Sequence, residues 1–539
     1  MANSLYLINP RSEVATYFGA ESYEYFGFEP AQSIADLATA TVAAMVPGDW
    51  RVEICEEYVQ QVDFDHPADF VGLTGKITQV SRMLEIAGEF RSRDKTVIIG
   101  GPFASLSPEV VRDHCDVLVT GELEAIAETL FADLASGSWQ GEYDGGDKPD
   151  LTTSPLPRWD LYPNDRAVMG CVQTSRGCPF ECEFCDVIQY LGRQQRHKSI
   201  DQIIGELDQL YAIGYRSVFL ADDNLTVYRK KAKAILAAIR DWNAERLDDP
   251  VAFNTQVSID AARDPEIMRL LAEAGMTWVF IGIETPNEES LREAKKRQNV
   301  GIDLVGQIQV FFDHGIQVTA GMIVGFDHDG LDIFERQYEF AMSTPIPMFS
   351  LGALVAPAAT PLHDRMQESG RLLKGGSEIA GSPWDTNILP TQMSREQLFA
   401  GLKWLCNELY TPANFGQRVL QMIERMGPQR GPFSKQNKAL AARRRRPVEV
   451  EALAMLKKLI RRGPEERKMW QVVWEGMQEM PESEPMVMEA LFRYAQVRCL
   501  YETGQIWEPH VASGGPSLGP PQATGASGLV TIGSGATGG

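Results

Sequence analysis

Three cysteines lie within eight residues of the chain, at Cys178, Cys182 and Cys185. Thiolates are soft ligands, and three on one short loop can converge on a soft metal centre. A structural zinc site needs four protein ligands, and no nearby Cys or His pair supplies the fourth at a finger-like spacing. Four-iron clusters are usually held by four cysteines. Three therefore predict an iron–sulfur loop with one iron open to a substrate or cofactor; a structural cluster or unrelated thiols are the alternative.

Short apolar segments after this loop alternate with helical patterns. The candidate strands are residues 167–173, 217–221, 251–256, 277–283, 317–324 and 348–355. Six such units predict a partial (β/α)6 barrel, in which chemistry is placed at the C-terminal ends of the strands. Asp222 and Asp223 follow the second strand, where a carboxylate pair can bind a cation or an ammonium group. Capping of the next helix is the alternative for this pair.

Polar residues and glycines also end the later strands. Gln256 and Ser258 follow the third strand, and Glu284 follows the fourth. A carboxylate in the position of Glu284 would not stay unpaired if it were buried. Hydroxyl and carboxylate groups of this kind suit the recognition of a ribose. Gly325 ends the fifth strand, where a missing side chain allows a flat ring to approach; a kink in the strand is the alternative.

The first 135 residues show a second α/β alternation. Strands are expected at residues 5–8, 51–55, 70–73, 96–99 and 117–120, with a helical pattern at 33–45. This is a doubly wound, Rossmann-type pattern, and ligands of such sheets bind beyond the carboxyl ends of the strands. The residues at these ends are Thr74, Gly75, Gly100, Gly101, Gly121 and Glu122. Glycines let the backbone approach a large flat cofactor or a phosphate, although ordinary strand-to-helix turns also use them.

The cysteine loop resembles a known sequence pattern. Residues 174–185, Thr-Ser-Arg-Gly-Cys-Pro-Phe-Glu-Cys-Glu-Phe-Cys, are similar to the cluster loop of radical S-adenosylmethionine (radical SAM) enzymes, including the aromatic Phe184. The resemblance implies a [4Fe-4S] cluster whose open iron binds SAM, and reductive cleavage of SAM to a 5′-deoxyadenosyl radical. It implies that Asp222 and Asp223 hold the methionine amino group, where Gly-Gly-Glu is commoner. It also implies that the strand ending at Gly325 contacts adenine.

The regions on either side of the barrel resemble parts of the same family. Residues 97–104 and 116–124 look like the cobalamin-binding domain that precedes many radical SAM domains. The Asp-x-His-x-x-Gly motif does not occur there, so the resemblance implies cobalamin without a histidine ligand from the protein. Residues 386–412 resemble the C-terminal region of a subgroup that includes hopanoid methylases and bacteriochlorophyll side-chain methylases.

These patterns divide the chain into five parts. They are a cobalamin-binding-like α/β domain (1–135), a linker rich in Gly and Pro (136–165), the radical SAM barrel (166–370), a helical region (371–503) and a tail (504–539). The tail is Gly, Ser, Pro and Ala with little to bury, and it is predicted to be disordered.

Composition limits the partners. The formal charge of −22 and pI near 4.9 argue against a nucleic-acid partner. No apolar run approaches the length of a transmembrane helix, and the first residues lack signal-peptide features. Clustered thiols without an even disulfide framework fit the cytoplasm. The family resemblance implies an electron donor such as flavodoxin or ferredoxin, and a small-molecule or lipid-like substrate.

The resemblance favours methylation of an unactivated carbon of that substrate with the help of cobalamin. A radical SAM enzyme that does not methylate, but performs a cyclisation, rearrangement or oxidation, is the first alternative. An iron–sulfur electron carrier or sensor is the second. The many polar strand ends argue against a carrier, because a carrier does not need a SAM pocket.

Overall fold

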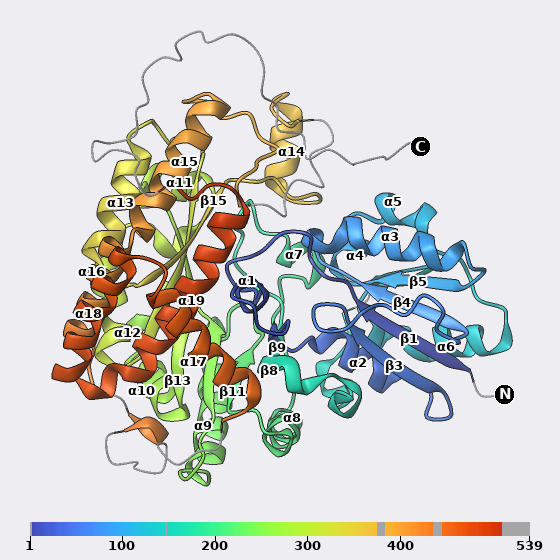
Figure 1. The fold of residues 1–539 in the computed structure, drawn as a ribbon. Coiled ribbons are helices and arrows are strands. Elements are labelled where there is room, and N and C mark those ends of the chain that lie inside the picture. Colours follow the sequence, from blue (N-terminus) through green and yellow to red (C-terminus); the bar gives the residue numbers. More distant parts are fainter. Residues whose placement is uncertain (1–2, 147, 374–382, 429, 435–444, 509–539) are drawn as a thin grey trace.

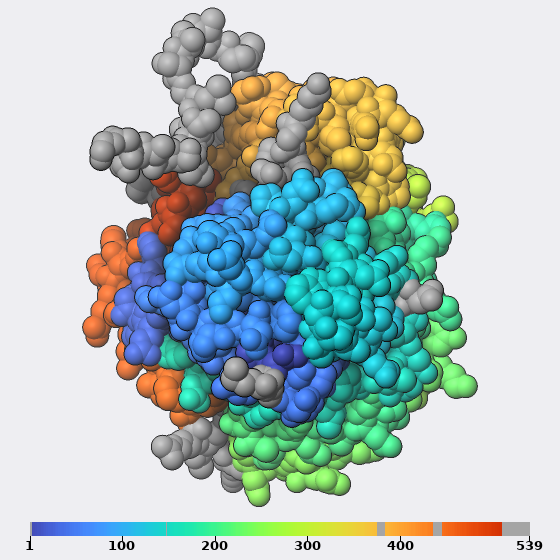
Figure 2. Space-filling view, turned by 90° about the vertical axis from the view of Figure 1, so that its right-hand side faces the viewer, coloured from blue at the N-terminus to red at the C-terminus, as the bar shows by residue number. Residues whose placement is uncertain are grey.

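Two parallel β-sheets and a C-terminal set of helices build the protein (Figure 1). The computed structural model describes residues 3–146, 148–373, 383–428, 430–434 and 445–508. In the space-filling view, the N-terminal α/β domain packs against the barrel and the C-terminal region (Figure 2). A single hydrophobic core cluster extends from Leu5 and Leu7 in the first strand to Tyr501 near the end of the chain. The predicted parts therefore share one core.

The N-terminal sheet has six parallel strands in the order β3-β1-β4-β5-β6-β7. Their bounds are β1 Ser4–Asn9, β3 Arg51–Glu56, β4 Phe70–Thr74, β5 Thr96–Gly100, β6 Val117–Gly121 and β7 Glu142–Gly145. Its helices include α2 (Leu37–Met45), α3 (Val80–Arg91), α4 (Pro102–Leu106) and α6 (Ala127–Ser136). A second apolar cluster joins α3 to the central strands. The doubly wound α/β prediction is confirmed.

The second sheet is the predicted partial barrel. Its parallel strands run in the order β15-β14-β13-β12-β11-β8-β2. Their bounds are β2 Gln32–Ile34, β8 Ala167–Val172, β11 Ser217–Leu220, β12 Ala252–Gln256, β13 Met276–Glu284, β14 Gln317–Val324 and β15 Met348–Ala353. The intervening helices are α8 (Ile200–Ile213), α9 (Arg229–Ala244), α10 (Pro265–Ala274), α11 (Glu288–Glu293), α12 (Leu304–Asp313) and α13 (Ile333–Ser343). All six predicted barrel strands are present.

Two local predictions were wrong. The helix expected from residue 33 begins only at Leu37, because the Asp36 carboxylate caps it by accepting from the Thr39 backbone N–H. The preceding β2 instead pairs with β8 and becomes the edge of the barrel. Within the predicted linker, Glu142–Gly145 forms β7, which pairs with β6 and buries Tyr143.

The C-terminal region is helical, as predicted. After α14 (Pro361–Glu368), which ends the barrel part, its helices are α15 (Arg395–Tyr410), α16 (Pro412–Arg425), α17 (Pro447–Ile460), α18 (Pro464–Glu479) and α19 (Glu484–Thr503). The last helix, α19, contacts the N-terminal helix α1 (Ser22–Tyr25) (Figure 1). No described helix is both long and apolar enough to cross a membrane.

The start of the predicted disordered tail is folded. Trp507 lies over the Arg498 guanidinium at 3.9 Å, and the Glu508 backbone N–H donates to the Asn407 side chain at 2.7 Å. These residues fold because Ile506 and Trp507 have apolar side chains to bury, whereas the residues that follow them are mostly small or polar. Residues 509–539, where the rest of the prediction falls, lie outside the described residues.

Candidate functional site

The three cysteines lie on the loop between β9 (Ser175–Arg176) and α7 (Val187–Tyr190). Cys182 is buried, while Cys178 and Cys185 are partly exposed. Gly177 precedes the first of them with φ of 96°, and a Cβ there would lie 2.8 Å from the Gln194 carbonyl oxygen. Only glycine fits this turn into the loop.

The donor set is three thiols on one short loop, which suits an iron–sulfur cluster. No three His, Cys, Asp or Glu side chains in the described ranges are arranged to hold one metal ion. In a four-iron cluster the cysteine thiolates bind the iron atoms. Three thiols on one short loop match the prediction of a cluster with one open iron.

A mostly buried lysine, Lys296, which the sequence analysis did not single out, accompanies the cysteines. The Lys296 ammonium lies 2.6 Å from the Glu284 carboxylate and faces the thiols of Cys182 and Cys185. Burial opposes its charge, but Glu284 and these thiols hold its pKa above the usual value. Lys296 can therefore offset the negative charge of thiolates. It follows α11, and nothing in its local sequence marks this role.

Asp222 and Asp223 lie beside the start of the same loop. The fully buried Asp222 accepts hydrogen bonds from Thr174 and Ser175 at 2.9 and 2.5 Å. Its other oxygen, Oδ2, has no hydrogen-bond partner within the described part of the chain. Asp223 accepts from the Gly177 backbone N–H at 2.9 Å. Burial raises the pKa of both carboxyl groups to about 6.

An unpartnered buried carboxylate oxygen is costly unless a ligand completes its hydrogen bonding. The Oδ2 atom of Asp222 is such an acceptor. An ammonium group would supply both hydrogen-bond donors and compensating charge. The arrangement therefore suits the binding of an ammonium group, and capping does not account for it, since α9 begins only at Arg229.

The candidate ribose residues are split into two environments. Ser258 lies within 3.0 Å of the Asn224 side chain, next to the carboxylate pair, and Gln256 is partly exposed at the end of β12. Glu284 instead directs Oε1 to Lys296, with its backbone in the left-handed region at φ of 66°. The structure thus brings Ser258 towards the carboxylates and pairs Glu284 with Lys296 instead.

Phe184 and Gly325 are brought together through Phe326. The Phe184 and Phe326 rings meet edge to face with centroids 6.2 Å apart. Gly325 adopts φ of 101°, and its N–H donates to the Asp329 carboxylate at 3.0 Å. The positive φ explains why glycine stands at the end of β14. An aromatic ring of the loop therefore lies beside this glycine turn.

A cavity of about 700 Å³ opens at the carboxyl edge of the N-terminal sheet. Five of the six candidate cobalamin residues line it: Thr74, Gly100, Gly101, Gly121 and Glu122. Gly75 is not part of the lining; its carbonyl accepts from the Phe103 backbone N–H at 3.2 Å. Cys171, Gln173, Phe219 and Ala221 of the barrel also line the cavity. One cavity therefore joins the two sheets.

The lining of this cavity suits a large ring system. The sheet contributes apolar side chains to it, among them Leu5, Leu7, Ile98 and Val119. Gly101 has φ of 96°, and a Cβ on it would come within 2.3 Å of the Thr74 hydroxyl. The sheet edge is consequently flat at this point. The volume lies within the range of ordinary cofactor sites.

Comparisons with known proteins place these features in a family. Residues 172–341 match the model of the radical SAM superfamily, and residues 360–498 match a domain of unknown function, DUF4070. An uncharacterised methyltransferase of Synechocystis sp. is 35% identical over 72% of this chain and 73% of its own length. The hopanoid C-2 methylase of Rhodopseudomonas palustris is 32% identical over 62% of this chain and 64% of its own.

The solved structures agree on the fold. The cobalamin-dependent SAM radical enzyme OxsB, with aqua-cobalamin and SAM bound, superimposes with a TM-score of 0.58 at 15% identity, covering 94% of this chain and 80% of OxsB. That similarity extends from the N-terminal sheet through the barrel. The cysteine loop, the barrel and the sequence matches together show that this chain is a member of the radical SAM superfamily, whose enzymes use a [4Fe-4S] cluster and SAM.

Proposed function

We propose that the enzyme methylates an unactivated carbon of a small-molecule or lipid-like substrate, with cobalamin held in the cavity between the sheets. The single observation that carries this proposal is the continuity of that cavity from the N-terminal sheet to the barrel strands β8 and β11. Two relatives named as methylating enzymes support it. When bound, cobalamin supplies a methyl group to a carbon radical, which cannot take a methyl cation from SAM by ordinary displacement.

The site would consist of two subsites, one for cobalamin and one for SAM. The apolar sheet face and the glycine edge at Gly100 and Gly101 would hold the corrin ring and exclude water from its surface. Asp222 and Asp223 would hold the SAM ammonium group, with Ser258 and Gln256 towards its ribose. Phe184 and Gly325 would bound the adenine. Glu284 would act through Lys296 on the cluster loop.

The substrate would enter the barrel lumen from the cavity. Phe219 lines the cavity and stacks on Trp278 at 6.3 Å, and Phe18 meets Phe280 edge to face at 5.4 Å. These aromatic surfaces favour an apolar substrate. Reduction of the cluster requires a donor, for which flavodoxin or ferredoxin is proposed. Because all eight cysteines are free thiols, we place the enzyme in the cytoplasm.

SAM affinity should depend on pH through the carboxylate pair. With a pKa of about 6, each carboxyl group is ionised at pH 7.5 and becomes protonated as the pH falls below 6. Protonation removes the charge that attracts the ammonium group, so the SAM dissociation constant should rise as pH falls, roughly fourfold by pH 5.5 for one carboxylate. Equilibrium dialysis of SAM from pH 5.5 to 8 measures this. The Asp222→Asn variant should bind SAM weakly with a flatter profile; a flat wild-type profile would contradict the proposed site.

Cobalamin retention tests the function directly. The protein is purified without oxygen, its cluster is reconstituted, hydroxocobalamin is added, and the desalted sample is analysed for iron and for its visible spectrum. We expect about one cobalamin per chain. Iron without cobalamin would leave a radical SAM enzyme and would exclude cobalamin-dependent methylation, favouring the cyclisation, rearrangement or oxidation alternative.

A further inference from the structure

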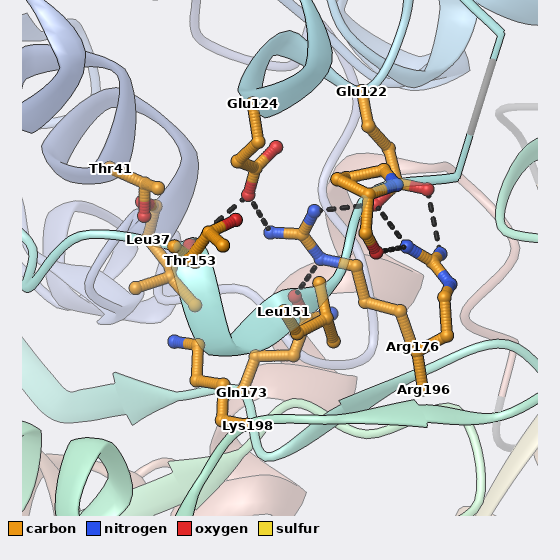
Figure 3. A network of polar contacts seen from close by, with 12 residues as sticks. Leu37, Thr41, Glu122, Glu124, Leu151, Thr153, Gln173, Arg176, Arg196 and Lys198 are labelled. Carbon is orange, nitrogen blue, oxygen red and sulfur yellow. Dashed lines mark hydrogen bonds and ion pairs between the residues drawn. The ribbon is translucent and has the colours of Figure 1, made fainter.

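A group of buried ion pairs connects the N-terminal domain to the cluster loop (Figure 3). Arg176 lies between two carboxylates, 2.7 Å from Glu122 and 2.8 Å from Glu124. Arg196 also binds Glu122 at 2.7 Å. The Glu122 side chain is only 1% exposed, and the side chains of Arg176 and Arg196 are 13% and 14% exposed. Both acidic residues follow β6, and both arginines belong to the radical SAM part of the chain.

Backbone pairing explains why the carboxylates are needed. Strand β9, which ends at Arg176, pairs antiparallel with β10 (Arg196–His197), and Arg176 stands directly opposite Arg196. Like charges directly opposite each other in a strand pair are destabilising. Glu122 reaches both guanidinium groups and compensates for this repulsion. The two-residue pairing therefore depends on a side chain from the other domain.

The backbone conformation of Gly121 orients Glu122 towards the two arginines. Gly121 has φ of 73°, and a Cβ on it would lie 2.5 Å from the Gly145 carbonyl group. The Glu122 backbone N–H then donates to the Gly145 carbonyl at 3.2 Å. The end of β6 is thus held tightly to β7. Burial acts to raise the pKa of Glu124, but the Arg176 charge outweighs it and the pKa is lowered.

The network leads directly to the proposed SAM site. Arg176 is followed by Gly177 and Cys178, so its side chain anchors the start of the cluster loop. The N–H of Gly177 donates to the Asp223 carboxylate at 2.9 Å. A displacement of Arg176 would therefore move the hydrogen-bonded partner of Asp223 as well as the first cluster ligand.

We propose that Arg176 is a positioning residue, which Glu122 and Glu124 of the N-terminal domain hold so that the cluster loop and Asp223 keep the geometry that SAM binding requires. The inference rests on the proposed SAM site. Its consequence is that a substitution in the N-terminal domain weakens SAM binding although Glu122 does not contact SAM. Arg176 and Glu122 also line the cavity, so the same ion pair fixes the cavity relative to the cluster.

The test uses the full-length, cluster-reconstituted protein without cobalamin or substrate. For each variant we would measure the SAM dissociation constant, the electron paramagnetic resonance spectrum of the reduced cluster with SAM, and the melting temperature. Glu122→Gln should raise the SAM dissociation constant at least about tenfold and broaden the spectrum, because the two arginines lose their shared partner. Glu466→Gln is the matched control, since Glu466 forms a similarly buried 2.7 Å ion pair with Arg498 in the C-terminal helices. It should lower the melting temperature and leave SAM affinity within about twofold.

A double variant separates positioning from folding. Glu122→Gln leaves the two arginines with one carboxylate, Glu124, and adding Arg176→Gln restores equal numbers of positive and negative groups among these four residues, so stability should partly recover. SAM affinity should not recover, because the loop still lacks its anchor. Parallel recovery of both, or unchanged SAM affinity in Glu122→Gln, would overturn the inference. Asp223→Asn distinguishes the two proposals. If SAM affinity is unchanged in Asp223→Asn, the proposed SAM site is wrong, and the proposed effect of Arg176 through Gly177 is wrong with it. If Asp223→Asn loses SAM affinity but Glu122→Gln does not, only the positioning role of Arg176 is overturned.

Discussion

Replacing Cys178, Cys182 and Cys185 together with alanine is expected to abolish iron binding and to lower reductive SAM cleavage at least about 100-fold. The physical reason is that the electron that breaks the S–C bond comes from the cluster, and the protein has no other described group that supplies it. Removing the thiols also takes away negative groups that stabilise the charge of the Lys296 ammonium, and leaves its ion pair with Glu284. The measurement is 5′-deoxyadenosine formed after anaerobic reconstitution and dithionite reduction, together with iron content and the visible spectrum of the cluster.

The matched control for the triple variant is Cys171→Ala. Cys171 is a buried thiol of β8, seven residues before the loop, and burial raises its pKa to about 12, so it stays protonated near neutral pH. A protonated thiol is a poor ligand, and this variant should keep its iron and its SAM cleavage. Cleavage at the wild-type rate in the triple variant would refute the assignment of the cluster loop. Loss of iron in Cys171→Ala would mean that a fourth cysteine takes part.

The strand ends could be located from the sequence because they follow local rules. Each barrel strand is an apolar run between helical patterns, and the residues after it must lie at the C-terminal edge of the sheet. This reasoning predicts Asp222 and Asp223 at the carboxyl edge of the barrel, where the structure has Asp223 hydrogen-bonded to the start of the cysteine loop. The same rule placed Gly100, Gly101 and Gly121 on one cavity. What these residues bind in the enzyme stays a prediction.

The partners of those residues could not be predicted, because they come from distant parts of the chain. Glu122 was expected only as a cofactor contact, yet its oxygens meet Arg176 and Arg196, 54 and 74 residues away. Glu284 was expected to need a partner if buried, but its sequence does not identify Lys296. The three-residue strand β2 was also missed, since it is too short to show a period and forms only by pairing with β8. Long-range charge pairing leaves no periodic signal in a single sequence.

Filling the cavity from helix α2 should remove cobalamin binding with little effect on the cluster. Ala38 lines the cavity on α2, and its small, exposed side chain faces space rather than packed core. An indole in Ala38→Trp would occupy part of the volume that the corrin ring needs. A loss of ~3 kcal/mol in binding free energy raises the dissociation constant about 100-fold. Retained cobalamin should therefore fall well below one-tenth per chain after desalting.

Ala44→Trp is the control for this prediction, because Ala44 lies on the same helix and is not part of the cavity lining. It introduces the same side chain at a similar propensity cost and should retain cobalamin. In both variants SAM cleavage should stay within about threefold of wild type, because the three cluster cysteines and Asp222 belong to the barrel part of the chain and do not line the cavity. Full cobalamin retention in Ala38→Trp would show that cobalamin binds elsewhere. Loss of cobalamin in both variants would mean that any large side chain on α2 disturbs binding. The prediction that Ala38→Trp acts by filling the cavity would then be wrong.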